Sequence, residues 1–143
     1  PAVGVRGTRR IVGEHVLTAD DILGASRFAD VIARAAYPID IHNPTGPGTI
    51  IARLPPGEAY DIPLRALLPL EVEHLVVAGR CISGTYEAHS SYRVAPICFA
   101  TGQAAGVCAA LSTRHGIAAR QLPASAVQAE LLRQGAGLGD RTS

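Results

Sequence analysis

The hydrophobic pattern first predicts a helix near the amino terminus. Residues 11–17 form a short β-rich run, and Thr18 and the two aspartates after Ala19 then suit a helix start, because threonine can cap the first turn and carboxylates favour its positive end. The apolar positions beyond keep roughly helical spacing, so the pattern extends this helix to about Ala36, although Gly24 weakens its first turn.

Short extended runs follow this predicted helix. Prolines and glycines bracket two of them, Ile39 to His42 and Thr49 to Leu54, and a third passage covers Tyr60 to Pro63 and Leu64 to Pro69. Such short runs separated by turn residues are typical of paired strands. We therefore expect an antiparallel strand layer from the first seventy residues.

The second half of the chain alternates apolar and polar blocks. The run from His74 to Gly79 contains β-branched residues and ends at a glycine, which indicates a buried strand. Residues 77–96 read as a loop rich in glycine, hydroxyl groups, arginine and histidine. Val94 to Thr113 carries no charge and predicts a helix packed on several sides, and Pro123 to Gln134 predicts an amphipathic helix that stops before a glycine. The expected class is α+β, with a long buried helix beside the strand layer.

The uncharged helix has a second interpretation, because twenty residues without charge match the length of a membrane span. Polar residues and a proline interrupt it, however, and alanine favours insertion far less than leucine does. Gly102 and Gly106 lie four residues apart and allow close backbone approach in either setting. We expect a buried helix of a soluble protein and no membrane contact.

Composition limits the core and the partners. Hydrophobic residues make up 48% of the chain but aromatic residues only 4%, so the core must be built from small aliphatic side chains, which bury less area each. We therefore expect a partner surface to complete it, by homo-oligomerisation or through a missing amino-terminal half. The net charge is +1 and the basic residues are scattered, which argues against a nucleic-acid partner.

The cysteines and histidines predict neither a disulfide framework nor a metal site. The chain has an odd number of cysteines, namely Cys81, Cys98 and Cys108, and no two of them form a C-x-x-C pair. We therefore expect three small buried residues in a reducing, cytoplasmic compartment. His15, His74 and His115 likewise have no ligand at metal-binding spacing. The chain begins at Pro1 without a signal-peptide pattern or an initiating methionine, and we expect it to be part of a longer protein.

The loop between residues 77 and 96 offers a place for an electron-rich ligand. The first-turn N–H groups of the following helix have no intrahelical partner, and together with the helix dipole they favour partial negative charge. Arg93 opposes that dipole, which makes it a poor residue for helix stability but a good one for gripping an anion. Alternatively, Arg93 is a solvated side chain at a loop end.

Several blocks of this chain resemble one family in the same order. They are RRIVGE (9–14), YPIDIH (37–42), YDIP (60–63), LVVAGRCIS (75–83), EA (87–88) and RVAPICFATGQAAG (93–106). These blocks resemble the carboxyl-terminal third of FAD-dependent oxidoreductases, flavoproteins distantly similar to fumarate reductase flavoprotein subunits. The resemblance implies a fragment of a two-domain FAD-binding α/β fold that acts on a small-molecule substrate.

The resemblance also assigns roles along the chain. Residues 1–70 would belong to a substrate-binding layer, residues 71–115 to the flavin-facing strand, loop and helix, and residues 116–143 to a final helix and tail. The isoalloxazine end of FAD would contact Gly79, Arg80, Arg93 and the amides of Val94 and Ala95. Those two amides would face the pyrimidine oxygen, where negative charge accumulates on reduction.

Candidates for chemistry are few, and no catalytic residue is assigned. By the resemblance, His42 would face substrate, or it is a turn histidine; Glu87 and His89 could exchange protons with substrate, or they are structural. Arg53 and Arg65 could hold an acidic substrate or be solvated. The pattern contains neither a Ser-His-Asp order nor a phosphate loop.

Two departures from the family pattern bear on function. No G-x-G-x-x-G follows a strand, and the glycines at 135–139 come after the last predicted helix, so the pyrophosphate half of the cofactor site is absent. Tyr86 and His89 stand where relatives often have histidine and leucine, so no catalytic histidine carries over to position 86. The chain is therefore either part of a flavin enzyme that cannot hold FAD well alone or a scaffold module that lost the cofactor.

Overall fold

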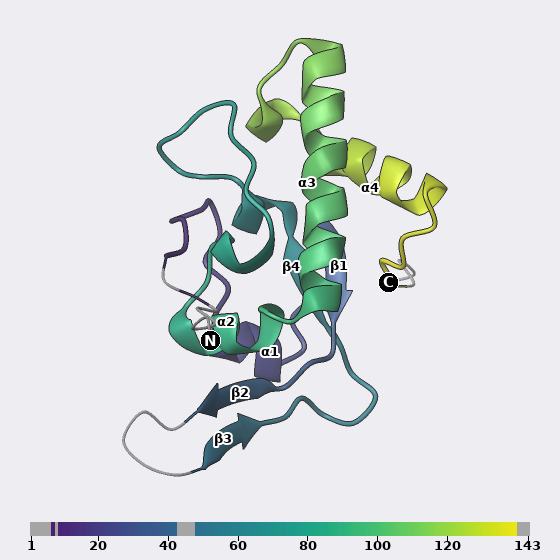
Figure 1. Cartoon of the computed structure of the whole chain (residues 1–143). Helices are drawn as coiled ribbons and strands as arrows, with labels where there is room; N and C mark the ends of the chain where they lie inside the picture. Colours follow the sequence, from purple (N-terminus) through teal and green to yellow (C-terminus); the bar gives the residue numbers. More distant parts are fainter. Residues whose placement is uncertain (1–6, 8, 43–47, 140–143) are drawn as a thin grey trace, which may run out of the picture.

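The computed structural model describes residue 7, residues 9–42 and residues 48–139, and it has the expected α+β architecture (Figure 1). Two antiparallel strand pairs, β1 with β4 and β2 with β3, lie beside one long helix. The elements are α1 (Ala19–Leu23), β1 (Val31–Ala35), β2 (Ile39–His42), β3 (Thr49–Ala52), β4 (Tyr60–Pro63), α2 (Tyr86–Tyr92), α3 (Ala95–His115) and α4 (Ala124–Arg133).

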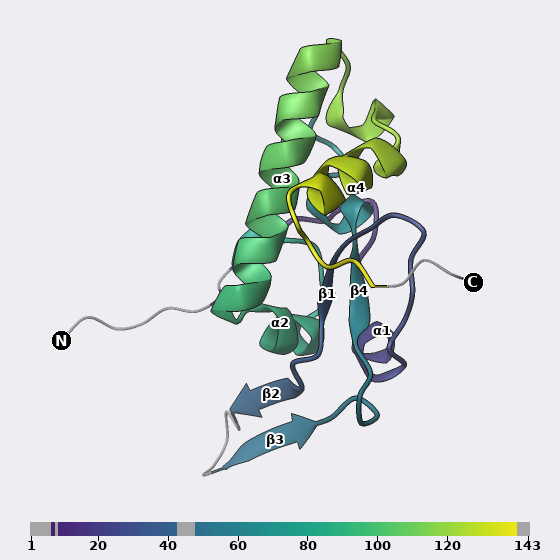
Figure 2. The ribbon, with the colours of Figure 1, turned by 90° about the vertical axis from the view of Figure 1, so that its right-hand side faces the viewer.

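Helix α3 is the central element of the fold. It runs along the β1–β4 pair, and α4 crosses near its middle, as the two perpendicular views show (Figures 1 and 2). The β2–β3 hairpin extends away at the end where α3 begins, next to α2. The amino terminus of α3 is thus surrounded by α2 and the hairpin.

The core lies between α3, α4 and the β1–β4 pair and consists mainly of aliphatic side chains, as the composition predicts. Two buried polar groups hold its parts together. The Gln128 amide of α4 donates hydrogen bonds to the carbonyl oxygens of Ala29 (2.8 Å) and Val31 (3.0 Å). The Ser91 hydroxyl of α2 donates to the Tyr37 carbonyl (2.6 Å) and lies 2.8 Å from the Tyr60 hydroxyl, which therefore donates to it.

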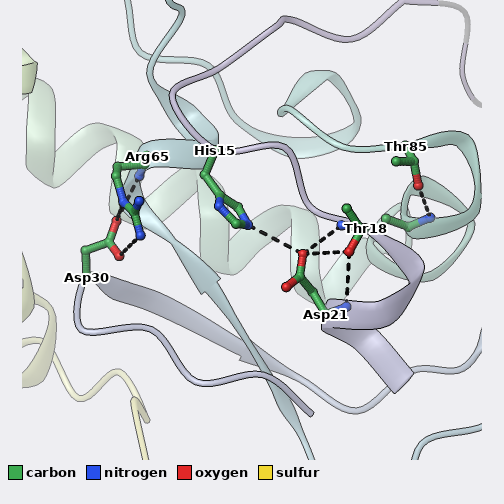
Figure 3. Close-up of polar contacts among 7 residues, drawn as sticks. His15, Thr18, Asp21, Asp30, Arg65 and Thr85 are labelled. Atoms are coloured by element: carbon green, nitrogen blue, oxygen red, sulfur yellow. Dashed lines mark hydrogen bonds and ion pairs between the residues drawn. The ribbon is translucent and has the colours of Figure 1, made fainter. Parts of the chain in front are cut away.

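The predicted amino-terminal helix is much shorter than the pattern indicated. Its start is confirmed: Thr18 caps α1, and the Asp21 carboxylate accepts a bond from the Thr18 N–H (2.9 Å), as Figure 3 shows. The helix ends at Leu23, because Gly24 follows and Ala25 takes a positive φ of 49°. The extension to Ala36 was wrong, since residues 31–35 are strand β1, paired with β4.

Three expected strands are also absent from the described residues. The run 11–17 makes only isolated bridges, at Gly13 and Leu17, and residues 64–67 form a 3-10 helix. The segment 74–79 was expected to be a buried strand, but it has no strand partner in the described chain, and Leu75 is 43% exposed. A strand needs a neighbour to satisfy its backbone groups, and an apolar sequence alone does not supply one.

Both later helices are confirmed, and one helix was missed. Helices α3 and α4 match the expected 94–113 and 123–134 within two residues. Helix α2 was interpreted as loop, although Thr85 is a recognisable cap whose hydroxyl accepts a bond from the Ala88 N–H at 3.3 Å (Figure 3).

Helix α3 is covered on one side only within the described chain. Its buried residues repeat at helical spacing, whereas Phe99 on the opposite side is 76% exposed. By length and hydropathy α3 could also cross a membrane, and 28% of its most apolar window is buried. The core helix of a soluble protein meets the same criteria, so this property does not separate the two alternatives.

The cysteines differ from expectation. All three are free thiols, but only Cys108 is buried; Cys98 is half-buried and Cys81 is exposed. The expectation of three buried cysteines was therefore wrong for two of them, because the turn that contains Cys81 lies on the surface rather than in a strand. Over the described ranges, no three His, Cys, Asp or Glu side chains are grouped to hold a metal ion.

The buried amide of Gln128 gives a direct test of this packing. Replacing Gln128 with Ala leaves the buried Val31 carbonyl and the partly buried Ala29 carbonyl without their donor, which should lower the free energy of unfolding by about 1–3 kcal/mol. Urea denaturation followed by circular dichroism would measure the change. Gln103→Ala is the matched control, because Gln103 donates a surface hydrogen bond to Gln134, and its effect should stay within about 0.5 kcal/mol. Equal effects of the two substitutions would contradict the packing described here.

Candidate functional site

The candidate site lies where the 3-10 turn Gly79–Cys81 meets the first turns of α3. Gly79 has a positive φ of 69°, a conformation that favours glycine, and its N–H donates to the Thr101 hydroxyl at 3.0 Å. Thr101 is fully buried, and its hydroxyl can donate to the carbonyl of Ile97 or Cys98, both at 3.1 Å. The turn is therefore fixed to α3 through a buried hydroxyl.

Two arginines link this turn to the neighbouring elements. The Arg80 Nε donates to the Arg93 carbonyl at 3.1 Å, and the Arg93 Nη2 donates to the Asp40 carbonyl in β2 at 3.1 Å. Each guanidinium has five N–H donors, so both retain further N–H groups for a ligand. Arg93 thus connects the hairpin to the α2–α3 junction.

A third arginine comes from the amino-terminal segment. The Arg10 Nε donates to the Gly84 carbonyl at 2.9 Å. Arg10, Arg80 and Arg93 all lower the pKa of the same histidine, His89, so their charges lie near one another. Among the described residues no carboxylate pairs with any of the three. We call these three residues the arginine cluster.

The helix end adds main-chain donors to the arginine cluster. Val94 is the N-cap of α3 and supplies no side-chain hydrogen bond, Ala95 is the first helical residue, and the first turn contains no acidic residue. The N–H groups of a first turn have no intrahelical acceptor and carry partial positive charge. Pro96 has no N–H, so it offers no such donor. The junction is therefore electropositive from both main chain and side chains.

His89 lies beneath the arginine cluster and is 3% exposed. Burial, followed by the charges of the three arginines, lowers its pKa to about 4, so the imidazole is neutral at physiological pH. Its Nε2 has no hydrogen-bond partner in the described structure, and its ring meets Tyr92 edge to face at 5.4 Å. A β-carbon at Gly7 would collide with the imidazole, so Gly7 packs directly on it.

The structure brings together some of the residues singled out from the sequence. Gly79, Arg80, Arg93, Val94 and Ala95 all lie at this junction, with His89 next to them. Their contact with a cofactor remains a prediction. Sequence reasoning missed Arg10 and the anchoring Thr101; Arg10 is part of the RRIVGE block, and Thr101 of the ATG block, but neither pattern reveals a contact across the chain.

Other candidates lie apart or are already paired. Glu87 is exposed in the first turn of α2, whereas His89, two residues later, is buried, so the two do not act as a pair. His42 ends β2 opposite Thr49, and its side chain lies outside the described part of the structure. Arg53 is exposed on the segment after β3.

Arg65 is engaged by a carboxylate. Its Nε and Nη2 donate to the two Asp30 oxygens at 3.0 and 3.1 Å, as Figure 3 shows. Burial raises the pKa of Asp30, but the bonds from Arg65 outweigh it and lower that pKa overall. This bidentate pair joins the start of β1 to the segment after β4, so it acts structurally.

The environment of His89 predicts a pH dependence of stability. Its pKa of about 4 in the folded chain lies below the usual histidine value of 6.5, so the unfolded chain binds the proton more readily. The free energy of unfolding should therefore fall as pH drops from about 6.5 towards 4 and level off below. His89→Asn should remove this part of the slope when urea unfolding is measured at each pH, whereas His115→Asn, at the exposed end of α3, should leave it unchanged. An unchanged slope in His89→Asn would contradict the buried, neutral state.

Comparison with known proteins identifies the family. The model of a family described as FAD dependent oxidoreductase matches residues 1–131, which is most of the chain. Searches of curated proteins and of solved structures gave no significant match. The match includes the turn, the arginine cluster and α3, so the junction belongs to the matched region. On this evidence the chain belongs to the FAD-dependent oxidoreductase family.

Proposed function

We propose that this chain forms the part of a flavin-dependent oxidoreductase that holds the ring end of FAD, together with one side of the substrate site. The observation that carries the proposal is the arginine cluster at the amino terminus of α3, which has no carboxylate partner among the described residues. The family match supplies the cofactor class.

The groups at the junction fit the pyrimidine side of an isoalloxazine ring. That side presents carbonyl oxygens and gains negative charge on reduction, which suits guanidinium and first-turn N–H donors. Gly79 has no side chain to block a flat ligand, and His89 has a buried Nε2 without a partner. When bound, FAD would supply the electron transfer that protein side chains cannot perform.

The residues of this chain would have distinct tasks in that pocket. Arg93, which donates to the Asp40 carbonyl, would orient the flavin ring relative to the β2–β3 hairpin. Arg80 would lie over the 3-10 turn, where it donates to the Arg93 carbonyl. The Ala95 N–H would bind a ring carbonyl oxygen. His89 is neutral and could donate or accept one hydrogen bond without adding charge. Substrate would lie on the side of the β2–β3 hairpin, where His42 ends β2.

The pocket would be incomplete in this chain. The sequence has no G-x-G-x-x-G, so groups for the pyrophosphate and adenine would have to come from another segment or chain. The free energy of FAD binding to this chain would then come from contacts with the isoalloxazine ring alone. The alternative is a scaffold module that has lost the cofactor, and the exposed side of α3 is the observation that favours it.

Ligand titration separates these alternatives. The purified chain should be colourless and should bind riboflavin and FAD weakly and about equally, because it contacts the ring but not the pyrophosphate. Arg93→Ala should weaken riboflavin binding by about 10- to 100-fold, since a charge-assisted hydrogen bond contributes roughly 1.5–3 kcal/mol. Fluorescence quenching of riboflavin measures both affinities.

The matched control is Arg53→Ala, which removes an exposed arginine away from the junction and should leave affinity unchanged. Equal affinities of native chain and Arg93→Ala would refute the assignment of the ring site. Much tighter binding of FAD than of riboflavin would refute the missing pyrophosphate site.

The open side of α3 generates a prediction about association. Phe99 is 76% exposed on that side, and Gly102 and Gly106 have open space around them. Farther along, an open groove of about 690 Å³ separates α3 from residues 74–76. An apolar surface of this kind drives association in water. We propose that it packs against a second copy of this chain or a missing amino-terminal half.

Light scattering tests this association on the purified chain. We expect a dimer or larger oligomer, and Phe99→Asp should shift it towards monomer because a charge would be buried at the contact. Leu132→Asp, on the exposed side of α4, is the matched control and should not change the mass. A native chain that remains monomeric at high concentration would contradict the proposal.

A further inference from the structure

Two members of the arginine cluster are anchored through the same atom. Arg10 and Arg80 each donate to a carbonyl oxygen through Nε, at 2.9 and 3.1 Å, so neither bond uses the two terminal nitrogens of the guanidinium group. Those paired nitrogens can bind the two oxygens of one carboxylate through parallel hydrogen bonds, which makes arginine well suited to recognise this planar anion. Both side chains therefore keep the donors that a carboxylate requires.

Main-chain contacts bring the arginines to the same place. The N–H of Ile11, next to Arg10, donates to the carbonyl of Cys81, next to Arg80, at 3.0 Å. The Arg80 side chain in turn donates to the Arg93 carbonyl. The three arginines therefore lie on segments that contact one another.

A buried histidine beside the cluster has an unpaired ring nitrogen. His89 is 3% exposed, and its Nε2 has no hydrogen-bond partner in the described structure. Its ring meets Tyr92 edge to face, and a β-carbon at Gly84, whose carbonyl accepts the Arg10 bond, would lie 2.7 Å from the Tyr92 ring. Native proteins seldom leave a buried polar atom without a partner. The His89 nitrogen is therefore a second group at this junction that could bond to a ligand.

Flavin alone does not balance the charge of the junction. The isoalloxazine ring is uncharged when oxidised and gains at most a single negative charge on reduction, whereas three guanidinium groups and the positive end of α3 meet here. No carboxylate within the described ranges forms an ion pair with any of the three arginines. An anionic ligand besides the flavin ring would offset the remaining positive charge.

We propose that the arginine cluster binds a carboxylate group of the substrate. Arg10 and Arg80 would bind its two oxygens, while Arg93 orients the flavin ring and His89 offers one further hydrogen bond. The inference rests on the proposed flavin site, because only that site makes the bound anion a substrate. The subsite would select a carboxylate over the corresponding amide, since the amide N–H groups would face guanidinium donors.

The position differs from the one that the sequence suggested for an acidic substrate. Arg65 is already paired with Asp30, and Arg53 is exposed on the segment after β3. Arg10, by contrast, comes from the RRIVGE block and reaches the junction through its bond to the Gly84 carbonyl. Recognition of an acid is therefore assigned to the junction.

A titration with acetate tests the subsite on the whole chain without any flavin. In NMR spectra of the isotope-labelled chain, sodium acetate should shift the Nε–H signals of Arg10 and Arg80 until they saturate. Sodium chloride at the same ionic strength should not, because it screens charge without a specific contact. Acetamide, which has a similar shape but no charge, should leave these signals in place.

Substitutions on the amino-terminal segment separate the subsite from a general effect of charge. Arg10→Gln should weaken acetate binding about 10-fold, because charge-assisted hydrogen bonds are lost. Arg10→Lys should recover only part of the affinity, since lysine keeps the charge but not the fork. Arg9→Gln is the matched control: it removes the same charge from an exposed neighbour and should leave the affinity unchanged. Circular dichroism checks that each variant is folded.

Riboflavin binding is measured separately, so the two proposals can fail separately. Saturable acetate shifts in a chain that does not bind riboflavin would support the carboxylate subsite and refute the ring site. The carboxylate subsite is overturned if acetate acts no differently from chloride, or if Arg10→Gln binds acetate as tightly as the native chain. It is also overturned if dimethyl phosphate, a phosphodiester with a single charge, binds more tightly than acetate, because the arginines would then suit the phosphate groups of FAD.

Discussion

The hydrogen bond from the Gly79 N–H to the buried Thr101 hydroxyl is the contact on which the junction depends. It holds the 3-10 turn against α3 at 3.0 Å, and the turn brings Arg80 to the Arg93 carbonyl. Arg93 in turn contacts the β2–β3 hairpin through the Asp40 carbonyl. Three segments distant in sequence therefore meet at one helix end. There the positive end of the helix dipole and the guanidinium charges have the same sign.

This arrangement is costly for an isolated domain, because like charges gather around a neutral, buried histidine. An electron-rich group bound at the helix end would offset this repulsion. Helix α3 is also unusual for an isolated domain. It carries few charges, yet it is covered on one side only in the described chain. The family match shows a member of the FAD-dependent oxidoreductase family, and the electropositive junction and the uncovered helix are the observations on which our proposal of a shared flavin pocket rests.

Local signals predicted much of the fold. The Thr18 cap, the turn-bracketed hairpin 39–52 and the helix end at Gly135 all depend on a few adjacent residues, and each is found in the structure. The errors lie where distant contacts decide the outcome. Residues 31–35 keep a helix-like spacing but pair with β4, and residues 74–79 look like a strand but have no partner among the described segments. Apolar periodicity cannot show whether a neighbour exists.

The same limit applies to the site. The family blocks pointed to Gly79, Arg80, Arg93, Val94 and Ala95, and the structure places these residues together. The sequence alone does not show that Arg10 lies at this site, because its bond to the Gly84 carbonyl joins residues 74 positions apart. The packing of Gly7 on His89 likewise joins residues far apart in the sequence, which no local pattern connects.

The most direct test of the central claim is an NMR titration of the isotope-labelled chain with riboflavin, which has the ring but neither pyrophosphate nor adenine. The account predicts that the largest amide shifts occur at Gly79 to Cys81 and at Val94, Ala95 and Ile97, with smaller shifts in the β2–β3 hairpin. Shifts confined to α4 or to the far end of α3, or no shifts in a saturated riboflavin solution, would contradict it.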